Sequence, residues 1–305
     1  MDKNILIEKI LEEKKKRNTL ILAHTYQNPD IIDVADVTGD SFFLSKKAAE
    51  LKAERVIMCG VRFMAESVKL LSPETEVVLP VPEASCAMAK QISPERVREF
   101  KKNNPDTAVV AYINTTAALK AECDVCVTSS SAVKIVSKLP NKNILFIPDK
   151  NLGSFVQKKL PEKNIILWDG FCPVHNELTV DDIIKLKKEH GDALFAVHPE
   201  APKEVTELSD MAGATSEIIK YALSQKGKIL IGTEKGVVDY LSTHEKDGER
   251  FIQVAPEKLC CKDMKLTTLE NLYESIIGKC GEKIELDEET SKKALLAINK
   301  MLELG

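Results

Sequence analysis

The sequence predicts an α/β protein made of three similar units, pseudo-symmetric αβα in type, whose parallel sheets surround one central active-site cavity. The first observation behind this prediction is that an apolar run, a Pro or Gly and then a cysteine recur three times, at Cys86, Cys172 and Cys261. These cysteines are 86 and 89 residues apart, and such a period indicates internal repeats. The second observation is that nearly continuous apolar strands alternate with helical patterns, which is typical of parallel sheets covered on both faces.

Several further features recur in the same order in each unit. Each unit opens with a strand, over residues 20–24, 109–112 and 194–198. Each of these strands ends in a polar pair: His24 and Tyr26, Tyr112 and Asn114, His198 and Glu200. An aspartate then precedes a hydroxyl by five residues: Asp36 and Ser41, Asp124 and Ser129, Asp210 and Thr215. A further apolar strand follows, over residues 56–58, 144–147 and 229–231.

The other elements follow from apolar periodicity and helix-end signals. In and before the first unit we expect helices over 4–17, 41–52 and 62–71 and strands over 55–60 and 76–80. We expect linker helices over 93–102 and 180–189, with Thr179 capping the second. Closing helices are expected over 268–278 and 288–304. The predicted units span residues 1–88, 89–174 and 175–305.

Composition narrows the class of protein. The 305 residues carry a net charge of −4, and only Lys14–Arg17 forms a basic run, which argues against nucleic-acid binding as a main role. No apolar stretch reaches the roughly 18 residues that a membrane span needs, and the first residues do not resemble a signal peptide. We therefore expect a cytoplasmic, reducing location, where the eight cysteines are thiols or metal ligands rather than disulfides.

The cysteines at the repeat positions predict a metal centre. A single cysteine is most often a small buried apolar residue, but Cys86, Cys172 and Cys261 occupy equivalent places. Three thiolates suit a [4Fe–4S] cluster with one iron lacking a protein ligand, or a zinc site with an open position. Cys260 is a neighbour that could serve as the third ligand instead. We interpret Cys123-x-x-Cys126, which has no counterpart in the other units, as core, with a metal or redox role as the alternative.

The polar residues at the strand ends predict a site for proton transfer. In parallel sheets, ligands bind beyond the carboxyl ends of the strands, so the three polar pairs are expected to meet in one pocket. Ser41, Ser129 and Thr215 are each expected to begin a helix, where a hydroxyl can cap the helix and the helix N-terminus can bind an anion. A substrate with several carboxylates or a phosphate would suit such a pocket. No Walker loop or Gly-x-Gly-x-x-Gly motif indicates nucleotide binding.

The motifs together resemble one known family. The runs that carry the resemblance are Ala23–Gln27, Gly39–Ser41, Tyr112–Thr115, Pro148–Gly153, Gly170–His175, His198–Glu200, Ile231–Glu234 and Thr268–Leu272. They are similar to those of quinolinate synthase, the A protein of NAD biosynthesis, across essentially the whole chain. The resemblance implies three pseudo-symmetric αβα domains around a central cavity. It also implies condensation of iminoaspartate with dihydroxyacetone phosphate to quinolinate, with loss of phosphate and water.

The resemblance assigns roles to individual residues. It implies a [4Fe–4S] cluster held by Cys86, Cys172 and Cys261, whose open iron assists dehydration. Cys261 is preferred to Cys260 because it stands three residues before Met264, as the family's ligand does. The implied acid–base residues are Tyr26, Tyr112, Glu200, His24 and His198. The implied substrate-binding residues are His24, Ser41, Tyr112, Asn114, Ser129, His198, Glu200 and Thr215.

Two other functions remain open at this point. One is a different hydro-lyase or aldolase that uses zinc or iron in the same pocket, which metal analysis would distinguish. The other is an Fe–S sensor, although no DNA-binding helix pair or basic face is evident. The resemblance also implies a functional link to an aspartate-oxidising enzyme that supplies iminoaspartate, with no nucleic-acid or membrane partner.

Overall fold

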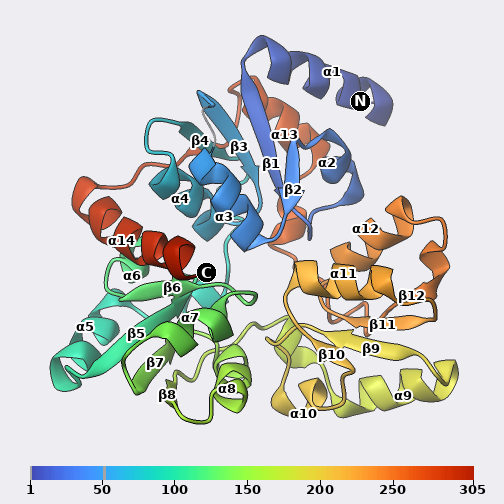
Figure 1. Cartoon of the computed structure of the whole chain (residues 1–305). Helices are drawn as coiled ribbons and strands as arrows, with labels where there is room; N and C mark the ends of the chain where they lie inside the picture. The colour runs from blue at the N-terminus through green and yellow to red at the C-terminus, as the bar shows by residue number, and fades with distance from the viewer. Residues whose placement is uncertain (1, 51–52) are drawn as a thin grey trace.

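A computed structural model describes residues 2–50 and 53–305 and places three sheets around one centre (Figure 1). The first sheet contains β1 (Thr19–His24), β2 (Val37–Gly39), β3 (Arg55–Cys59) and β4 (Glu76–Leu79). The second contains β5 (Thr107–Tyr112), β6 (Val125–Val127), β7 (Asn143–Ile147) and β8 (Asn164–Leu167). The third contains β9 (Leu194–Val197), β10 (Met211–Ala212), β11 (Ile229–Gly232) and β12 (Phe251–Gln253). The predicted fold class is confirmed.

The three sheets share one topology. Their strand orders are β4-β3-β1-β2, β8-β7-β5-β6 and β12-β11-β9-β10, and all of these pairs are parallel. The central strands are buried, as β5 and β11 are over their whole lengths. Burial on both faces explains why these strands are continuously apolar in the sequence.

Helices cover the sheets and join the units. Those before and within the first unit are α1 (Lys3–Lys16), α2 (Pro29–Val34), α3 (Ser41–Glu50) and α4 (Arg62–Leu71). The second unit has α5 (Pro94–Asn103), α6 (Ala117–Lys120), α7 (Ala132–Lys138) and α8 (Lys150–Lys159). The third has α9 (Val180–His190), α10 (Lys203–Thr206), α11 (Thr215–Ser224) and α12 (Gly236–His244). Most predicted helices agree within about two residues, and the last two residues of the predicted helix 41–52 lie outside the described residues.

The three repeated aspartates have the same structural role. Each carboxylate accepts the backbone N–H of a residue 15 positions earlier, in the first strand of its unit: Asp36 from Ile21 at 2.8 Å, Asp124 from Val109 at 2.7 Å and Asp210 from Phe195 at 2.8 Å. Each also faces a lysine of the helix before the unit: Lys14 at 2.9 Å, Lys101 at 2.8 Å and Lys187 at 3.7 Å. The helices α1, α5 and α9 are therefore equivalent members of the repeat.

The C-terminal segment packs away from the third unit. Helix α13 (Leu269–Ile276) contacts α1 and β3, and β13 (Glu282–Lys283) pairs antiparallel with β4 of the first sheet. Helix α14 (Glu288–Leu304) contacts α4 of the first unit and α6, α7 and β6 of the second (Figure 1). The segment therefore packs against the first and second units, although it lies inside the span 175–305 predicted for the third. The unit boundaries stay a prediction.

Across residues 2–50 and 53–305, no helix combines the length and the apolar character required to cross a membrane.

Candidate active site

A cavity of about 380 Å³ lies where the three units meet. The carboxyl ends of the first strands of all three sheets open onto it, as expected for parallel sheets. It is lined by every residue that the sequence singled out for a site: His24, Tyr26, Ser41, Cys86, Tyr112, Asn114, Ser129, Cys172, His198, Glu200, Thr215 and Cys261. The structure therefore brings together residues up to 237 positions apart, while their individual roles stay a prediction.

The three cysteines share one local geometry. Each is followed by a short 3-10 turn: η1 (Met88–Lys90) after Cys86, η2 (His175–Glu177) after Cys172 and η4 (Met264–Leu266) after Cys261. In each turn the backbone N–H of the residue three positions after the cysteine, in Ala89, His175 or Met264, acts to lower the pKa of the thiol. A nearby N–H dipole favours the thiolate. Met264 stands three positions after Cys261 and four after Cys260, so Cys261 fits the repeated geometry.

The donor set of the cavity fits a cationic centre. Burial raises the pKa of Cys86 to about 12 and that of Cys261 to about 12, and it raises the pKa of Cys172 well above its usual range. The negative charge of Cys86 raises the pKa of the other two further, so the three sulfurs are close enough to repel one another as thiolates. A bound metal reverses this balance, because its positive charge deprotonates coordinating thiols.

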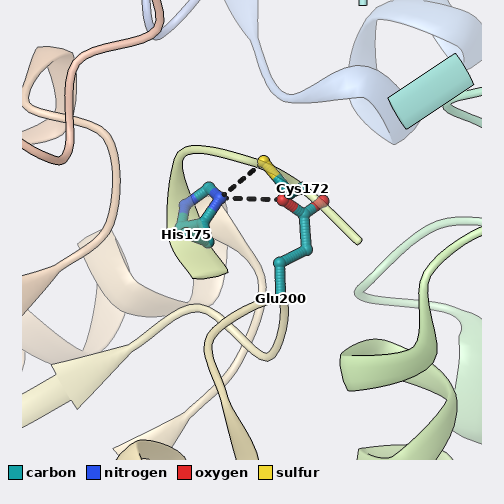
Figure 2. Close-up of side chains that lie close together, drawn as sticks. All are labelled: Cys172, His175 and Glu200. Atoms are coloured by element: carbon teal, nitrogen blue, oxygen red, sulfur yellow. Dashed lines mark hydrogen bonds and ion pairs between the residues drawn. The ribbon is translucent and has the colours of Figure 1, made fainter. Parts of the chain in front are cut away.

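His175 is a site residue that the sequence prediction missed. Its Nδ1 lies 2.8 Å from Oε2 of Glu200 and 3.4 Å from Sγ of Cys172 (Figure 2). One ligand atom of each of these three residues lies within 4.8 Å of the others, so they are a candidate metal site. The signal in the sequence was the Cys-Pro-Val-His run, which places His175 one helical turn after Cys172.

Glu200 is the buried carboxylate at the centre of the cavity. Burial alone would raise its pKa, but the neighbouring His198 and His175 and a hydrogen bond from Tyr112 hold the pKa of Glu200 below its usual range. Glu200 is therefore ionised at neutral pH. The side chain is only 3% exposed, so the carboxylate depends on these neighbouring groups rather than on water for its stabilisation.

The two strand-end histidines are neutral near pH 7. Burial lowers the pKa of His24 to about 4 and that of His198 to about 4. Nε2 of His198 lies 3.2 Å from Oγ of Ser129, and its Nδ1 lies 3.9 Å from Oε2 of Glu200. His198 thus stands between a hydroxyl and a carboxylate, and its Nδ1 accepts the N–H of Glu200, so the ring proton lies on Nε2 toward Ser129.

The two tyrosines are protonated. Burial raises the pKa of Tyr26 and of Tyr112 well above the usual range, and the charge of Glu200 raises both further. The Tyr26 hydroxyl lies 2.8 Å from Oγ1 of Thr215 and 2.9 Å from Oγ1 of Thr233. Thr233 also lies 2.9 Å from Nε2 of His175. Glu200, His175, Thr233 and Tyr26 therefore form one hydrogen-bonded chain, in which Thr233 was not predicted.

The hydroxyl prediction was partly wrong. Ser41 and Thr215 are the first residues of α3 and α11, but Ser129 lies in a turn three residues before α7 begins. Capping is also done by other residues: Oδ1 of Asp40 accepts the N–H of Phe43 at 2.9 Å at the start of α3. Asn114 has a buried Oδ1 for which the described residues offer no hydrogen-bond partner.

Two unpredicted carboxylates hold the cysteine loops. Asp149 accepts the N–H of Cys172 at 3.2 Å, and Glu234 accepts that of Cys261 at 3.2 Å. Each carboxylate stands two residues beyond the third strand of its repeat, and burial raises the pKa of both. Their second oxygens cap the following turn, from Leu152 at 2.9 Å and Gly236 at 2.7 Å.

The remaining cysteine motif lies outside the cavity. Cys126 is fully buried in β6, and burial raises its pKa to about 11. Cys123 precedes the strand, and its sulfur donates to the carbonyl of Leu119 at 3.1 Å. A thiol with a raised pKa is a poor nucleophile, so the structure agrees with the interpretation of this motif as core.

Fold and cavity together define a class of α/β enzyme with a candidate metal centre at the junction of three repeats. The profile of the quinolinate synthetase A protein family matches residues 8–303. A quinolinate synthase of Clostridioides difficile (strain 630) is 46% identical over 306 residues, covering 99% of this chain and 100% of the relative. Those of Caldicellulosiruptor saccharolyticus and Alkaliphilus metalliredigens are 45% and 43% identical over the full length of both chains. The chain belongs to the quinolinate synthetase A protein family and is an enzyme.

Proposed function

We propose that the protein is a quinolinate synthase that condenses iminoaspartate with dihydroxyacetone phosphate, using a [4Fe–4S] cluster held by Cys86, Cys172 and Cys261. The observation that carries the proposal is that three cysteines at equivalent places in the repeat line one cavity, each followed by a short 3-10 turn. Membership of the family supports the reaction.

The cysteines fit the cluster, because three thiolates in one cavity suit a centre that keeps one iron free of protein ligands. When bound, such a centre supplies a Lewis acid for a substrate carboxylate or hydroxyl. Asp149 and Glu234 fix the loops that carry Cys172 and Cys261. The chain thus contributes a pre-shaped donor set.

The pKa values of the ionisable residues indicate which of them accept protons and which donate them. Glu200 is ionised and accepts protons, whereas Tyr26 and Tyr112 keep theirs and donate. A series of hydrogen bonds links Tyr26 through Thr233 and His175 to Glu200. Once Glu200 has accepted a proton, this series can return one to the phenol oxygen of Tyr26. On the other side, Nδ1 of His198 accepts the N–H of Glu200, so Nε2 carries the ring proton and can donate a hydrogen bond to Ser129 or to a substrate oxygen held there.

The substrates of this reaction carry two carboxylates and a phosphate, and the cavity offers places for them. The N-termini of α3 and α11, with Ser41 and Thr215 as first residues, provide N–H groups and a favourable dipole for anions. Ser129 and Asn114 line the same cavity, where the hydroxyl and the amide NH2 can donate hydrogen bonds to such anions. His24 and His198 add no positive charge near pH 7, so anion binding relies on dipoles and hydroxyls.

The test is synthesis of quinolinate by anaerobically purified enzyme. Iminoaspartate is generated in situ from aspartate by an aspartate oxidase, dihydroxyacetone phosphate is added, and quinolinate and phosphate are measured. Equal amounts of both products are expected. A preparation that contains the intact cluster and forms neither product would overturn the proposal.

A second candidate function rests on Cys172, His175 and Glu200, which could hold a single zinc or iron ion. That arrangement would suit a mononuclear hydro-lyase or aldolase with an open coordination position. It predicts one metal ion per chain and no sulfide. It also leaves Cys86 and Cys261 without a role, which favours the first proposal.

The proposal includes the setting of the reaction. Iminoaspartate is an unstable imine, so an aspartate-oxidising enzyme acting in the same cytoplasmic compartment is its natural source. No nucleic-acid or membrane partner is part of the proposal.

A further inference from the structure

The three strand-end turns that line the cavity are held in different ways. In the first, Nδ1 of His24 accepts the N–H of Tyr26 at 3.1 Å. In the third, Nδ1 of His198 accepts the N–H of Glu200 at 3.3 Å. The second turn begins with Tyr112, whose ring has no nitrogen. The middle turn therefore lacks the internal bond that fixes the other two.

The backbone of the middle turn is also less restricted by proline. Pro29 follows the first turn and Pro199 lies inside the third, and each fixes its own φ. The residues 112–116 between β5 and α6 contain no proline. Tyr112 lines the same cavity as Glu200, whose charge raises its pKa, so the position of this turn matters and some other contact must hold it.

Lys120 supplies that contact from inside the protein. Its side chain is completely buried, and Nζ donates a hydrogen bond to the carbonyl of Thr115. Thr115 in turn donates from Oγ1 to the carbonyl of Tyr112 at 3.2 Å, and its N–H bonds the carbonyl of Ile113 at 2.8 Å. The ammonium is thus linked to the backbone of Tyr112 through one residue.

Glu66 completes the anchorage from the other end of α6. It projects from α4, is 8% exposed, and accepts the N–H of Ala117 at 2.7 Å. Among the described residues no carboxylate lies within ion-pair distance of Lys120, whose Nζ lies 5.6 Å from the ring centre of Phe63. Phe63 itself lines the cavity.

Burying an ammonium without an ion pair is unfavourable. Burial lowers the pKa of Lys120, although the charges of Cys126 and Glu66 act in the opposite direction. A methionine would fill much the same space without this cost. What a methionine cannot supply is the hydrogen bond to Thr115.

We propose that Lys120 is a positioning residue, which holds the turn 112–116 so that the hydroxyl of Tyr112 meets Glu200. The catalytic part of this inference rests on the proposed function, whereas the structural part does not. Two experiments separate them.

The first experiment is hydrogen exchange of the folded enzyme, comparing Lys120→Met with the parent. We expect exchange in the peptide covering 112–116 to accelerate about tenfold or more, while the peptides covering 24–27 and 198–201 keep their rates. Lys14→Met is the control. Lys14 is a buried lysine (9% exposed) of α1 that also donates to a backbone carbonyl, that of Val34 at 2.8 Å, and in addition pairs with Asp36 at 2.9 Å. Unchanged exchange of 112–116 in folded Lys120→Met overturns the inference, whether or not the enzyme makes quinolinate.

The second experiment is a double-mutant cycle with Tyr112→Phe. Misplacing a catalytic group can cost about 10²-fold in rate, so Lys120→Met is expected to lower kcat by roughly that factor in the parent. In the Tyr112→Phe background the same change is expected to lower kcat less than about twofold, because the group it positions is gone. Equal losses in both backgrounds would show a general effect on folding and overturn the inference.

Thr115→Val provides a second variant should Lys120→Met not fold. It is nearly isosteric and removes only the bond to the carbonyl of Tyr112. The same exchange pattern and the same non-additivity with Tyr112→Phe are expected, at smaller magnitude. Additive losses, or no change in exchange, count against the inference here too.

Discussion

The aspartate–lysine pairs beside the first strands and the polar pairs at the ends of those strands are products of the same threefold repeat, yet they differ in kind. The aspartates are identical in all three units and make the same backbone bond each time. The polar pairs are His and Tyr, Tyr and Asn, His and Glu. Positions with one structural task stayed alike, whereas positions that face a single asymmetric substrate differ.

The cysteines combine both patterns. They are identical like the aspartates, and they face the cavity like the polar pairs. Three equal ligands are expected only if the bound group itself presents equivalent positions to the three units, as a cuboidal cluster does. The comparison therefore separates residues that hold the fold, residues that hold the cofactor and residues that do the chemistry.

The largest effect is expected from changing a cysteine that holds the proposed cofactor. Cys172→Ser should abolish both iron binding and quinolinate synthesis, because it removes one of three ligands. Iron content and visible absorbance measure the loss. Cys260→Ser is the matched control and should keep iron and activity. If the Cys260 variant lost the iron and Cys261→Ser kept it, the assignment of the third ligand would be wrong.

The next largest effect is expected from changing a residue that transfers protons. Glu200→Gln should keep the cluster but lower kcat by about 10²–10⁴-fold, the usual contribution of a general acid–base group. Glu204→Gln, on the exposed face of α10, serves as control. Near-normal turnover in Glu200→Gln would remove this residue from the mechanism.

A smaller effect, on stability alone, is expected from changing one of the repeated aspartates that hold the fold. Asp124→Ala leaves the N–H of Val109 without its acceptor and should lower the free energy of unfolding by about 2 kcal/mol. Urea unfolding measures it, and kcat should stay within about twofold. The exposed Asp106→Ala is the control. A large fall in kcat with unchanged stability would contradict the division into classes.

The smallest effect is expected in the pH dependence of stability. Burial lowers the pKa of His24 from 6.5 to about 4, so between these values the unfolded chain binds one proton more than the native protein. The free energy of unfolding therefore falls as the pH drops from about 6.5 to 4.

His24→Asn keeps an acceptor for the N–H of Tyr26 and removes this titration. Its loss of stability between pH 7 and pH 5.5 should be smaller than that of the parent by about 1 kcal/mol. Urea midpoints at the two pH values test this, with the exposed His244→Asn as control. Parallel losses in parent and His24→Asn would show that His24 is not held neutral.

Much of the fold was predictable because the repeat compensates for weak local signals. A strand such as 109–112 is ambiguous by itself, but its equivalents at 20–24 and 194–198 fix its type and place. The capping box at Thr179 was predictable for a local reason, since Thr179 and Asp182 satisfy each other within one turn.

The error at Ser129 has a local cause as well. Thr128, Ser130 and Ser131 bond one another and the backbone, as in the contact of 2.9 Å from the N–H of Thr128 to Oγ of Ser131. Hydroxyl side chains that bond nearby backbone compete with the helix. The helix α7 therefore begins only at Ala132.

Other parts of the site were not predictable, because they depend on single side-chain contacts. Thr233 gains its role where units meet, by lying between Tyr26 of the first unit and His175, whereas Lys120 gains its role within the second unit, by reaching back to Thr115. Neither contact has a periodic signal in the sequence. The closing helices were predicted as elements, but the pairing of β13 with the first sheet was not.

The central claim is that Cys86, Cys172 and Cys261 hold one [4Fe–4S] cluster. The most direct test is iron and acid-labile sulfide per chain, with a visible spectrum, on protein purified without oxygen. The account predicts a brown protein with about four of each. One zinc or iron ion per chain without sulfide, bound to the Cys172, His175 and Glu200 site, would contradict it.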